Sequence, residues 1–311
     1  MGLLPFEAFF RSSGIILTEG AIVERLRREF SIPLDENIVH AGFIYNSKYR
    51  IALSGIYKQY LDIAEAYDLP IMIMTPTRRA NPERIALSEF KDRRVIADNV
   101  DFLNQLKAGY KTPVYIGGLT GCMGDAYSSS TPFTFDEAIQ FHTPTMQSFR
   151  EAGVDFLFAG IMPTVTESIA IANSMETTGL PYIISFMIRR AGVLIDGTTI
   201  HDAIATIDKN TQHQPLCYMA NCIHPDILHE ALSHPANRSK LVKTRFQGIQ
   251  ANASSLSPEE LNESKVLCSS SAEELTERML HLHADFSLKI YGGCCGTNEK
   301  HLRKIAEAFQ K

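Results

Sequence analysis

Short apolar runs alternate with amphipathic segments along the whole chain. The runs are rich in β-branched and aromatic residues, and Gly, Pro, Thr or Asn follow most of them. This pattern is typical of strands buried on both faces of a parallel sheet. We predict strands over residues 14–17, 70–74, 113–116, 154–158, 182–186, 215–219, 241–246 and 288–291.

The segments between these runs repeat apolar residues every three or four positions, which is the period of a helix with one buried face. In the segment 52–67, for example, Leu53, Ile56 and Ile63 share such a face. We predict helices over 21–30, 52–67, 95–107, 135–152, 165–178, 200–208, 224–233, 272–283 and 298–309. Thr297 is the expected N-cap of the last helix.

Strands that alternate with helices in this number predict an α/β fold, a (β/α)8 TIM barrel, with one domain over residues 1–311. An open doubly wound sheet is the alternative, because one misassigned strand would change the count. The sequence has no GxGxxG after the first strand and no GxxxxGK[ST], which disfavours the two commonest phosphate-binding folds. The stretch 251–266 is expected to be a polar excursion before the last unit.

The composition restricts the class of protein. With 45% hydrophobic and 21% charged residues in 311, the chain is neither disordered nor collagen-like. A net charge of −5 argues against nucleic acid as a partner. No apolar run approaches the ~20 residues that cross a bilayer, and the first residues lack the pattern of a signal peptide. We expect a cytoplasmic protein with no membrane partner, and homo-oligomer formation stays open.

The six cysteines are the most informative residues. Without an export signal we expect them to be reduced. Cys222 follows the sixth predicted strand, and Cys294 and Cys295 follow the eighth, next to turn residues. The other three are expected to pack as small apolar residues: Cys122, Cys217 and Cys268.

Residues just past the strands line the mouth of a (β/α)8 barrel, where strands six and eight can face one another. Three thiolates there would suit Zn²⁺, which takes four ligands and keeps one position open in catalytic sites. Side chains alternate along a strand, so Cys294 and Cys295 need irregular backbone, which Gly293 and Gly296 could supply. From the residues alone, buried packing cysteines remain an equal alternative, and a redox pair a weaker one.

Two segments resemble the homocysteine S-methyltransferase family. GGCCGTNEKHLRKIAEAF at 292–309 resembles its C-terminal signature, and MANCIHP at 219–225 resembles its Asn-Cys segment. Weaker similarities lie in the same order at 74–81, 140–142, 149–160 and 182–188. The resemblance implies a barrel methyltransferase that binds zinc through Cys222, Cys294 and Cys295 and methylates homocysteine in methionine biosynthesis.

The resemblance also implies a small-molecule thiol acceptor and a methyl donor, which would be S-methylmethionine, S-adenosylmethionine or a betaine. The chain ends soon after its last predicted helix, so we expect no cobalamin domain. There is no Trp, which excludes a donor cage built with Trp. The expected substrate-binding residues at the strand ends are Glu19, Thr75, Thr77 and Asn221.

The sequence departs from the family pattern at several substrate positions. Thr18, Glu19 and Gly20 stand where the family has Asp-Gly-Gly, and Gly160 stands where it has a Glu that contacts the amino group of homocysteine. Pro76, Arg78 and Arg79 replace other family residues. We interpret Arg78 and Arg79 as two charged side chains exposed to solvent, in preference to a binding site for a carboxylate or phosphate.

These departures keep two alternatives open. One is a zinc enzyme acting on another thiol or a methylated amine, and the other is a non-catalytic thiolate metal-binding protein. We expect His142, His224 and Asp155 to have structural roles.

Overall fold

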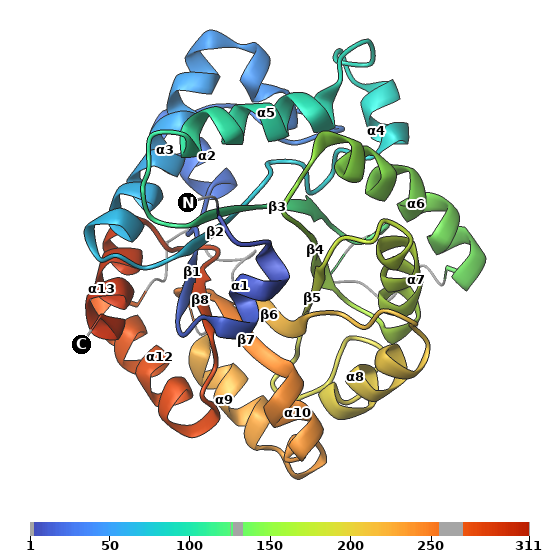
Figure 1. The fold of residues 1–311 in the computed structure, drawn as a ribbon, viewed down its shortest axis with the longest axis vertical. Coiled ribbons are helices and arrows are strands. Elements are labelled where there is room, and N and C mark those ends of the chain that lie inside the picture. Colours follow the sequence, from blue (N-terminus) through green and yellow to red (C-terminus); the bar gives the residue numbers. More distant parts are fainter. Residues whose placement is uncertain (1–2, 125, 127–132, 255–269, 311) are drawn as a thin grey trace.

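The computed structural model describes residues 3–124, 126, 133–254 and 270–310. Its strands form a closed parallel barrel in chain order, β1 to β8, in which β1 pairs with both β2 and β8 (Figure 1). This confirms the predicted (β/α)8 barrel over the open sheet. The strands are β1 (Ile16–Thr18), β2 (Ile71–Met74), β3 (Val114–Thr120), β4 (Phe156–Met162), β5 (Tyr182–Phe186), β6 (Cys217–Ile223), β7 (Phe246–Ala251) and β8 (Ile290–Gly293).

Helices form an outer ring around the barrel (Figure 1), and each predicted helix overlaps an observed one. The overlapping helices are α2 (Val23–Phe30), α3 (Ser47–Ala66), α5 (Val95–Lys107), α6 (Phe135–Ala152), α7 (Val165–Glu176), α8 (Ile200–Lys209), α9 (Pro225–Ser233), α12 (Ala272–Phe286) and α13 (Glu299–Phe309). The additional elements are α1 (Phe6–Ser12), α4 (Pro82–Leu87), α10 (Lys240–Arg245) and the 3-10 helices η1 (Ala41–Tyr45) and η2 (Pro235–Asn237).

The prediction of a strand over 241–246 is wrong. Residues Lys240–Arg245 form α10, and β7 begins at Phe246. Ser239 starts the helix by accepting a hydrogen bond from the backbone N–H of Val242, and a cap of this kind outweighs weak strand propensity. β7 itself needs Gly248, since a Cβ there would lie 2.7 Å from Cβ of Ile290 in β8.

The helix α1 closes the amino-terminal end of the barrel and crosses its axis in Figure 1. Phe6 stacks on Phe156 at the start of β4, with ring centroids 4.2 Å apart, and Phe10 is buried beside it. Both rings belong to the apolar cluster that fills the barrel interior together with Met72 and Ile290. The opposite end, where the strands finish, is therefore the mouth.

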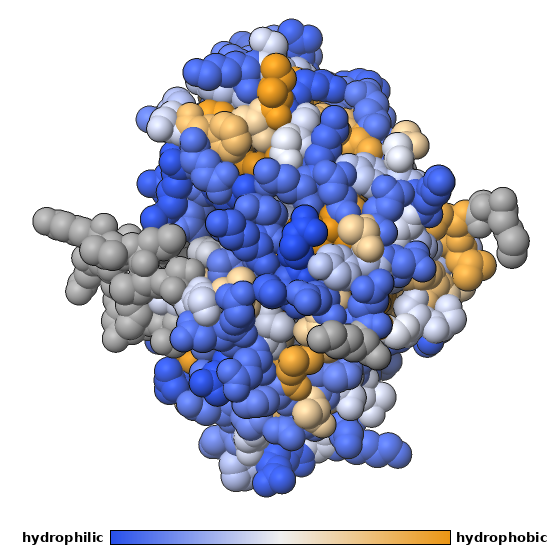
Figure 2. All heavy atoms as spheres, turned by 90° about the vertical axis from the view of Figure 1, so that its left-hand side faces the viewer, coloured by the Kyte–Doolittle hydropathy of each residue, from blue (hydrophilic) through white to orange (hydrophobic). Residues whose placement is uncertain are grey.

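The outer surface is mostly hydrophilic on the flank shown in Figure 2, with apolar residues in small separate groups. Large exposed apolar side chains come from different helices, among them Ile51 in α3 and Leu280 in α12. No helix among the described residues is long and apolar enough to span a membrane. The predicted polar excursion at 251–266 falls largely outside the described residues.

Candidate metal centre

Three cysteines converge at the carboxyl ends of β6 and β8. The Sγ atoms of Cys222, Cys294 and Cys295 all lie within 4.8 Å of one another, and those of Cys222 and Cys295 are 4.0 Å apart. In the described part of the chain, no other group of three or more metal-ligating side chains comes this close. The sequence predicted this convergence from the spacing of the thiols after two alternate strands.

A bulge in β6 sets the direction of Cys222. The register between β6 and β7 shifts from Asn221 to Ile223, and Cys222 has a φ of 57°, in the left-handed region that side chains disfavour. Alternation along a regular strand would point neighbouring side chains to opposite faces. The bulge breaks this alternation at Cys222, and the surrounding structure must hold the strained backbone in place.

Asn221 supplies part of that support. Its Oδ1 accepts a hydrogen bond from the backbone N–H of Ile161 (3.0 Å) and another from the hydroxyl of Ser185 (2.6 Å). These contacts join β4, β5 and β6 next to Cys222. Ile161 also has a positive φ, 58°, in a bulge of β4. In this structure Asn221 positions the segment that carries Cys222. Its predicted contact with substrate stays a prediction.

A turn after β8 presents Cys294 and Cys295 together. The strand ends at Gly293, and Gly296 has a φ of 78°, so Gly296 supplies the irregular backbone expected there. Gly293 has a different role, because a Cβ at this position would lie 2.7 Å from Cβ of Thr297. The Thr297 hydroxyl donates to the carbonyl of Cys294 (2.7 Å), which closes the turn.

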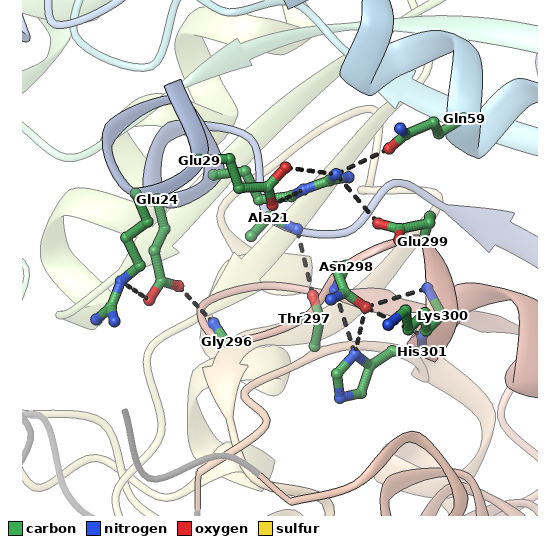
Figure 3. A network of polar contacts seen from close by, with 12 residues as sticks. Ala21, Glu24, Glu29, Gln59, Gly296, Thr297, Asn298, Glu299, Lys300 and His301 are labelled. Atoms are coloured by element: carbon green, nitrogen blue, oxygen red, sulfur yellow. Dashed lines mark hydrogen bonds and ion pairs between the residues drawn. The ribbon is translucent and has the colours of Figure 1, made fainter. Parts of the chain in front are cut away.

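This turn is also fixed from outside the barrel by α2 and the start of α13 (Figure 3). The Glu24 carboxylate accepts a hydrogen bond from the Gly296 N–H, and the Ala21 N–H donates to Thr297 Oγ1 over 3.2 Å. Thr297 is therefore not the N-cap of the last helix as predicted. Asn298 caps α13 instead, since its side chain accepts from the next turn of backbone.

The donor set fits a zinc ion. Tetrahedral thiolate ligands at Zn–S distances of about 2.3 Å place their sulfurs about 3.8 Å apart, close to the 4.0 Å between Cys222 and Cys295. Three protein sulfurs leave one coordination position for a substrate or water. Cys222 and Cys294 are half-buried, and Cys295 is exposed at the mouth.

The Cα atoms of Cys222 and Cys294 are 5.5 Å apart, in the range that a disulfide requires. Side chains placed to share one ion necessarily approach one another, so this spacing is compatible with metal binding in the reduced state and with a disulfide in the oxidised state. The expectation that the thiols are reduced stays a prediction.

Thr75 and Thr77 hydrogen-bond within the barrel wall. Their hydroxyl oxygens are 2.7 Å apart, and Thr77 donates to the Leu119 carbonyl while Thr75 accepts from the Leu119 N–H. Both side chains are buried. They connect β2 to β3 here, and their predicted contact with substrate stays a prediction.

Glu19 lies directly after β1 and is buried, with both carboxylate oxygens facing the Met74 N–H at 3.2 and 3.3 Å. Burial raises the pKa of Glu19 to about 8, against the lowering effect of its backbone hydrogen bonds. At neutral pH this carboxyl group is therefore mostly protonated. The sequence predicted an acid at the mouth and could not show that burial would suppress its charge.

A buried hydrogen-bonded contact between His142 and Glu167 near the mouth was not predicted. His142 Nε2 lies 3.0 Å from Glu167 Oε1, and the same oxygen accepts a hydrogen bond from the Met123 N–H. Glu167 follows the N-cap Thr164 by three residues, so in the sequence it resembles an ordinary capping acid. The pair fixes the segment after β3 against α6 and α7.

The remaining predicted structural residues have such roles. His224 caps α9 by accepting from the Asp226 N–H, and Asp155 accepts from the Ile116 N–H over 2.7 Å. Cys217 is buried in the barrel interior, and Cys122 packs with Cys222 in a small apolar cluster. The prediction for Cys268 falls outside the described residues.

Gly160 leaves no carboxylate on β4. A Cβ at Gly160 would lie 3.0 Å from Cδ1 of Leu119, whose side chain takes this space. The wall at this position is thus apolar, whereas the sequence had shown only that no acid stands there.

Comparison with known proteins identifies relatives of the chain. The family model for homocysteine S-methyltransferase matches residues 16–309. The homocysteine S-methyltransferase YbgG of Bacillus subtilis (strain 168) is 28% identical over 187 residues, which cover 59% of this chain and 56% of that protein. The match thus spans little more than half of the relative's length.

Solved structures share the fold. The metallated form of the homocysteine methyltransferase MmuM from Escherichia coli aligns with a TM-score of 0.78 over 98% of this chain and 100% of that one, at 18% identity. Its oxidized form aligns with a TM-score of 0.76 at the same identity. At such identity the likeness shows the fold alone, whereas the family model matches nearly the whole barrel with all three converging cysteines. The chain therefore belongs to the homocysteine S-methyltransferase family.

Proposed function

We propose that this protein is a zinc-dependent methyltransferase that moves a methyl group from a sulfonium or ammonium donor to a thiol, with homocysteine as the acceptor and methionine as the product. The observation that carries the proposal is the convergence of the Cys222, Cys294 and Cys295 sulfurs within 4.8 Å at the mouth. Family membership and the names of the relatives support the reaction class and the acceptor.

The three cysteines would hold the ion and leave one position for the substrate sulfur. A free thiol has a pKa of about 8.5 and is mostly protonated at neutral pH. A bound zinc ion supplies the deprotonation that makes the acceptor sulfur a nucleophile. Three thiolates with Zn²⁺ carry a formal charge of −1 (2 − 3), which favours a cationic methyl donor such as S-methylmethionine, S-adenosylmethionine or a betaine.

The residues of the chain position the reactants and need no covalent intermediate. Asn221 and the turn at Cys294–Thr297 keep the ligands in fixed directions, which reduces the entropy lost when two substrates align. The α1 plug closes the other end of the barrel to water. Ligand thiols must be reduced to bind metal, so the proposal includes the reducing cytoplasm as the site of action and a single catalytic domain.

A different acceptor is the second candidate. The apolar wall at Gly160 and Leu119 offers no acid to an ammonium group, which favours another thiol or a methylated amine. A panel of acceptors, each tested with sulfonium and betaine donors, decides between the two. Absence of methyl transfer to homocysteine, with transfer to another thiol, would favour this alternative.

Metal analysis tests the site itself. We expect about one zinc per chain in the wild-type protein and a strong loss of zinc in Cys295→Ser. The control is Cys122→Ser, which changes a half-buried thiol outside the ligand set and should keep its metal. Undiminished zinc in Cys295→Ser would refute the ligand assignment, and zinc uptake without methyl transfer to any thiol would indicate a metal-binding protein that is not an enzyme.

A further inference from the structure

Arg78 lies just past β2, at the mouth of the barrel. Its carbonyl accepts a hydrogen bond from the Gly121 N–H (2.9 Å), and its side chain runs over Gly121, where a Cβ would lie 3.0 Å from Cγ and 3.7 Å from Cδ of Arg78. The next residue, Cys122, packs in the same apolar cluster as the ligand Cys222. The stem of Arg78 is therefore held beside the metal centre.

The charged end of Arg78 has no partner among the residues that the structure describes, either as an ion pair or as a hydrogen bond of its guanidinium group. Its charge nevertheless acts on the mouth. Burial, and to a lesser extent the charge of Arg78, lower the pKa of His40 to about 3. A half-buried cation without a partner is costly, and an anion bound beside it relieves the cost.

The described carboxylates of the mouth are already engaged. Glu24 accepts from the Gly296 N–H and pairs with Arg28 at 2.9 Å. Glu167 pairs with His142, and Glu19 is buried against the Met74 N–H. The described mouth thus offers one free cation and no free anion to a substrate. A zwitterionic acceptor such as homocysteine can pair its carboxylate with Arg78, but no free carboxylate among the described residues of the mouth pairs with its ammonium group.

We propose that Arg78 anchors the acceptor through a carboxylate, and that the preferred acceptors are thiol carboxylic acids that need no ammonium group. A planar guanidinium matches a carboxylate in two parallel hydrogen bonds, which fixes direction as well as charge. The anchor holds the acid while the thiol end reaches the metal. This inference rests on the proposed zinc-dependent methyl transfer and names the substrate class of the same site.

Three thiols of equal chain length test the anchor. Homocysteine carries both charged groups, 4-mercaptobutyrate lacks the ammonium, and 3-aminopropane-1-thiol lacks the carboxylate. Calorimetric titration of each into the zinc-loaded full-length protein gives affinities without a methyl donor. We expect 4-mercaptobutyrate to bind at least as tightly as homocysteine, and 3-aminopropane-1-thiol to bind about tenfold or more weakly.

Variants assign the effect to Arg78. Arg78→Gln should weaken both carboxylic acids about tenfold or more and leave the amine unchanged, and Arg78→Lys should fall between. Arg84→Gln in α4 is the control, because Arg84 donates to the Asn37 carbonyl and should not affect any thiol. If Arg78→Gln does not fold, the affinities of the three thiols for the wild-type protein and for Arg78→Lys still test the anchor.

The outcomes separate the anchor from the proposed function. Equal weakening of all three thiols by Arg78→Gln would mean that Arg78 only balances the charge of the metal centre, and would refute the anchor. Tenfold tighter binding of homocysteine than of 4-mercaptobutyrate would refute it as well. Loss of zinc from the wild-type protein would overturn the proposed function and the anchor together. Binding of the acids that depends on Arg78, without methyl transfer from any donor, would overturn only the proposed function.

Discussion

Replacing Asn221 with alanine should weaken zinc binding without removing a ligand. The change deletes the oxygen that accepts from Ile161 N (3.0 Å) and Ser185 Oγ (2.6 Å). Both partners are buried in this region. Each hydrogen bond is worth about 1 kcal/mol net, and a buried donor left without a partner costs roughly 1–3 kcal/mol. The Ser185 hydroxyl can rotate toward another acceptor, whereas the Ile161 N–H in its bulge cannot.

The expected cost of Asn221→Ala is therefore about 2–4 kcal/mol in the free energy of unfolding, measured by denaturant titration of the reduced, metal-free protein. Because the bonds fix the bulge that directs Cys222, zinc affinity should fall about 10–100-fold, measured by competition with a chromogenic chelator. Ser185→Ala removes one of the two bonds and should cost about 1 kcal/mol.

A double-mutant cycle provides the refutation. Since Ser185 acts through Asn221, Ser185→Ala should cost little more in the Asn221→Ala background. Additive costs, or unchanged zinc affinity in a folded Asn221→Ala protein, would show that the bulge holds its ligand direction by other means.

Three further predictions concern the mouth and its turn. Gly293→Ala places a methyl group 2.7 Å from Cβ of Thr297, so it should lower the free energy of unfolding by about 1–3 kcal/mol and reduce the zinc content. Gly109→Ala, whose methyl group meets open space, is the control and should change neither quantity. The pKa of Glu19 is about 8 in the folded state and 4.5 in the unfolded chain, so its contribution to stability is complete below about 4.5 and is lost as the pH rises through 8. Glu19→Gln should flatten this loss of stability with pH, measured as the thermal unfolding temperature. A mild oxidant should form a disulfide between Cys222 and Cys294, whose Cα atoms are 5.5 Å apart, and release zinc, and dithiothreitol should reverse both effects. If the Cys294→Ser protein still loses the mass of two hydrogens on oxidation, this pairing is wrong.

The barrel was predictable because most of its strands are continuous apolar runs. β7 is the exception, and its sequence explains why the strand was wrongly predicted over residues 241–246. Its sequence, FQGIQA, contains a glycine needed for close packing against β8 and two glutamines. One of them, Gln250, donates to Thr18 Oγ1 in β1 over 3.1 Å. The other, Gln247, donates to the Lys243 and Thr244 carbonyls of α10. These polar residues interrupt the apolar pattern from which strands are recognised, so propensity favoured the neighbouring β-branched segment.

The convergence of Cys222, Cys294 and Cys295 was predictable for a different reason, since cysteines after two alternate strands restrict the topology strongly. The residues that direct these cysteines were harder to find. Asn221 reaches partners 60 and 36 positions away in the chain, and nothing local in the sequence connects them. The charge state of Glu19, and the lack of a partner for the Arg78 guanidinium among the described residues, depend equally on what packs around each side chain. Sequence pattern gives the element that carries a residue, and only the fold gives its partner.

The closure of one barrel end by α1 has a consequence for the order of kinetic events. With Phe6 and Phe10 sealing the amino-terminal end, both substrates of the proposed methyl transfer would enter, and both products would leave, through the same opening. The first substrate to enter would then be covered by the second, and its product would leave only after the product above it. Double-reciprocal plots of the steady-state rate should therefore intersect, and the product-inhibition pattern should be that of an ordered sequential mechanism. A molecule that joins acceptor and donor covalently should block entry and exit together.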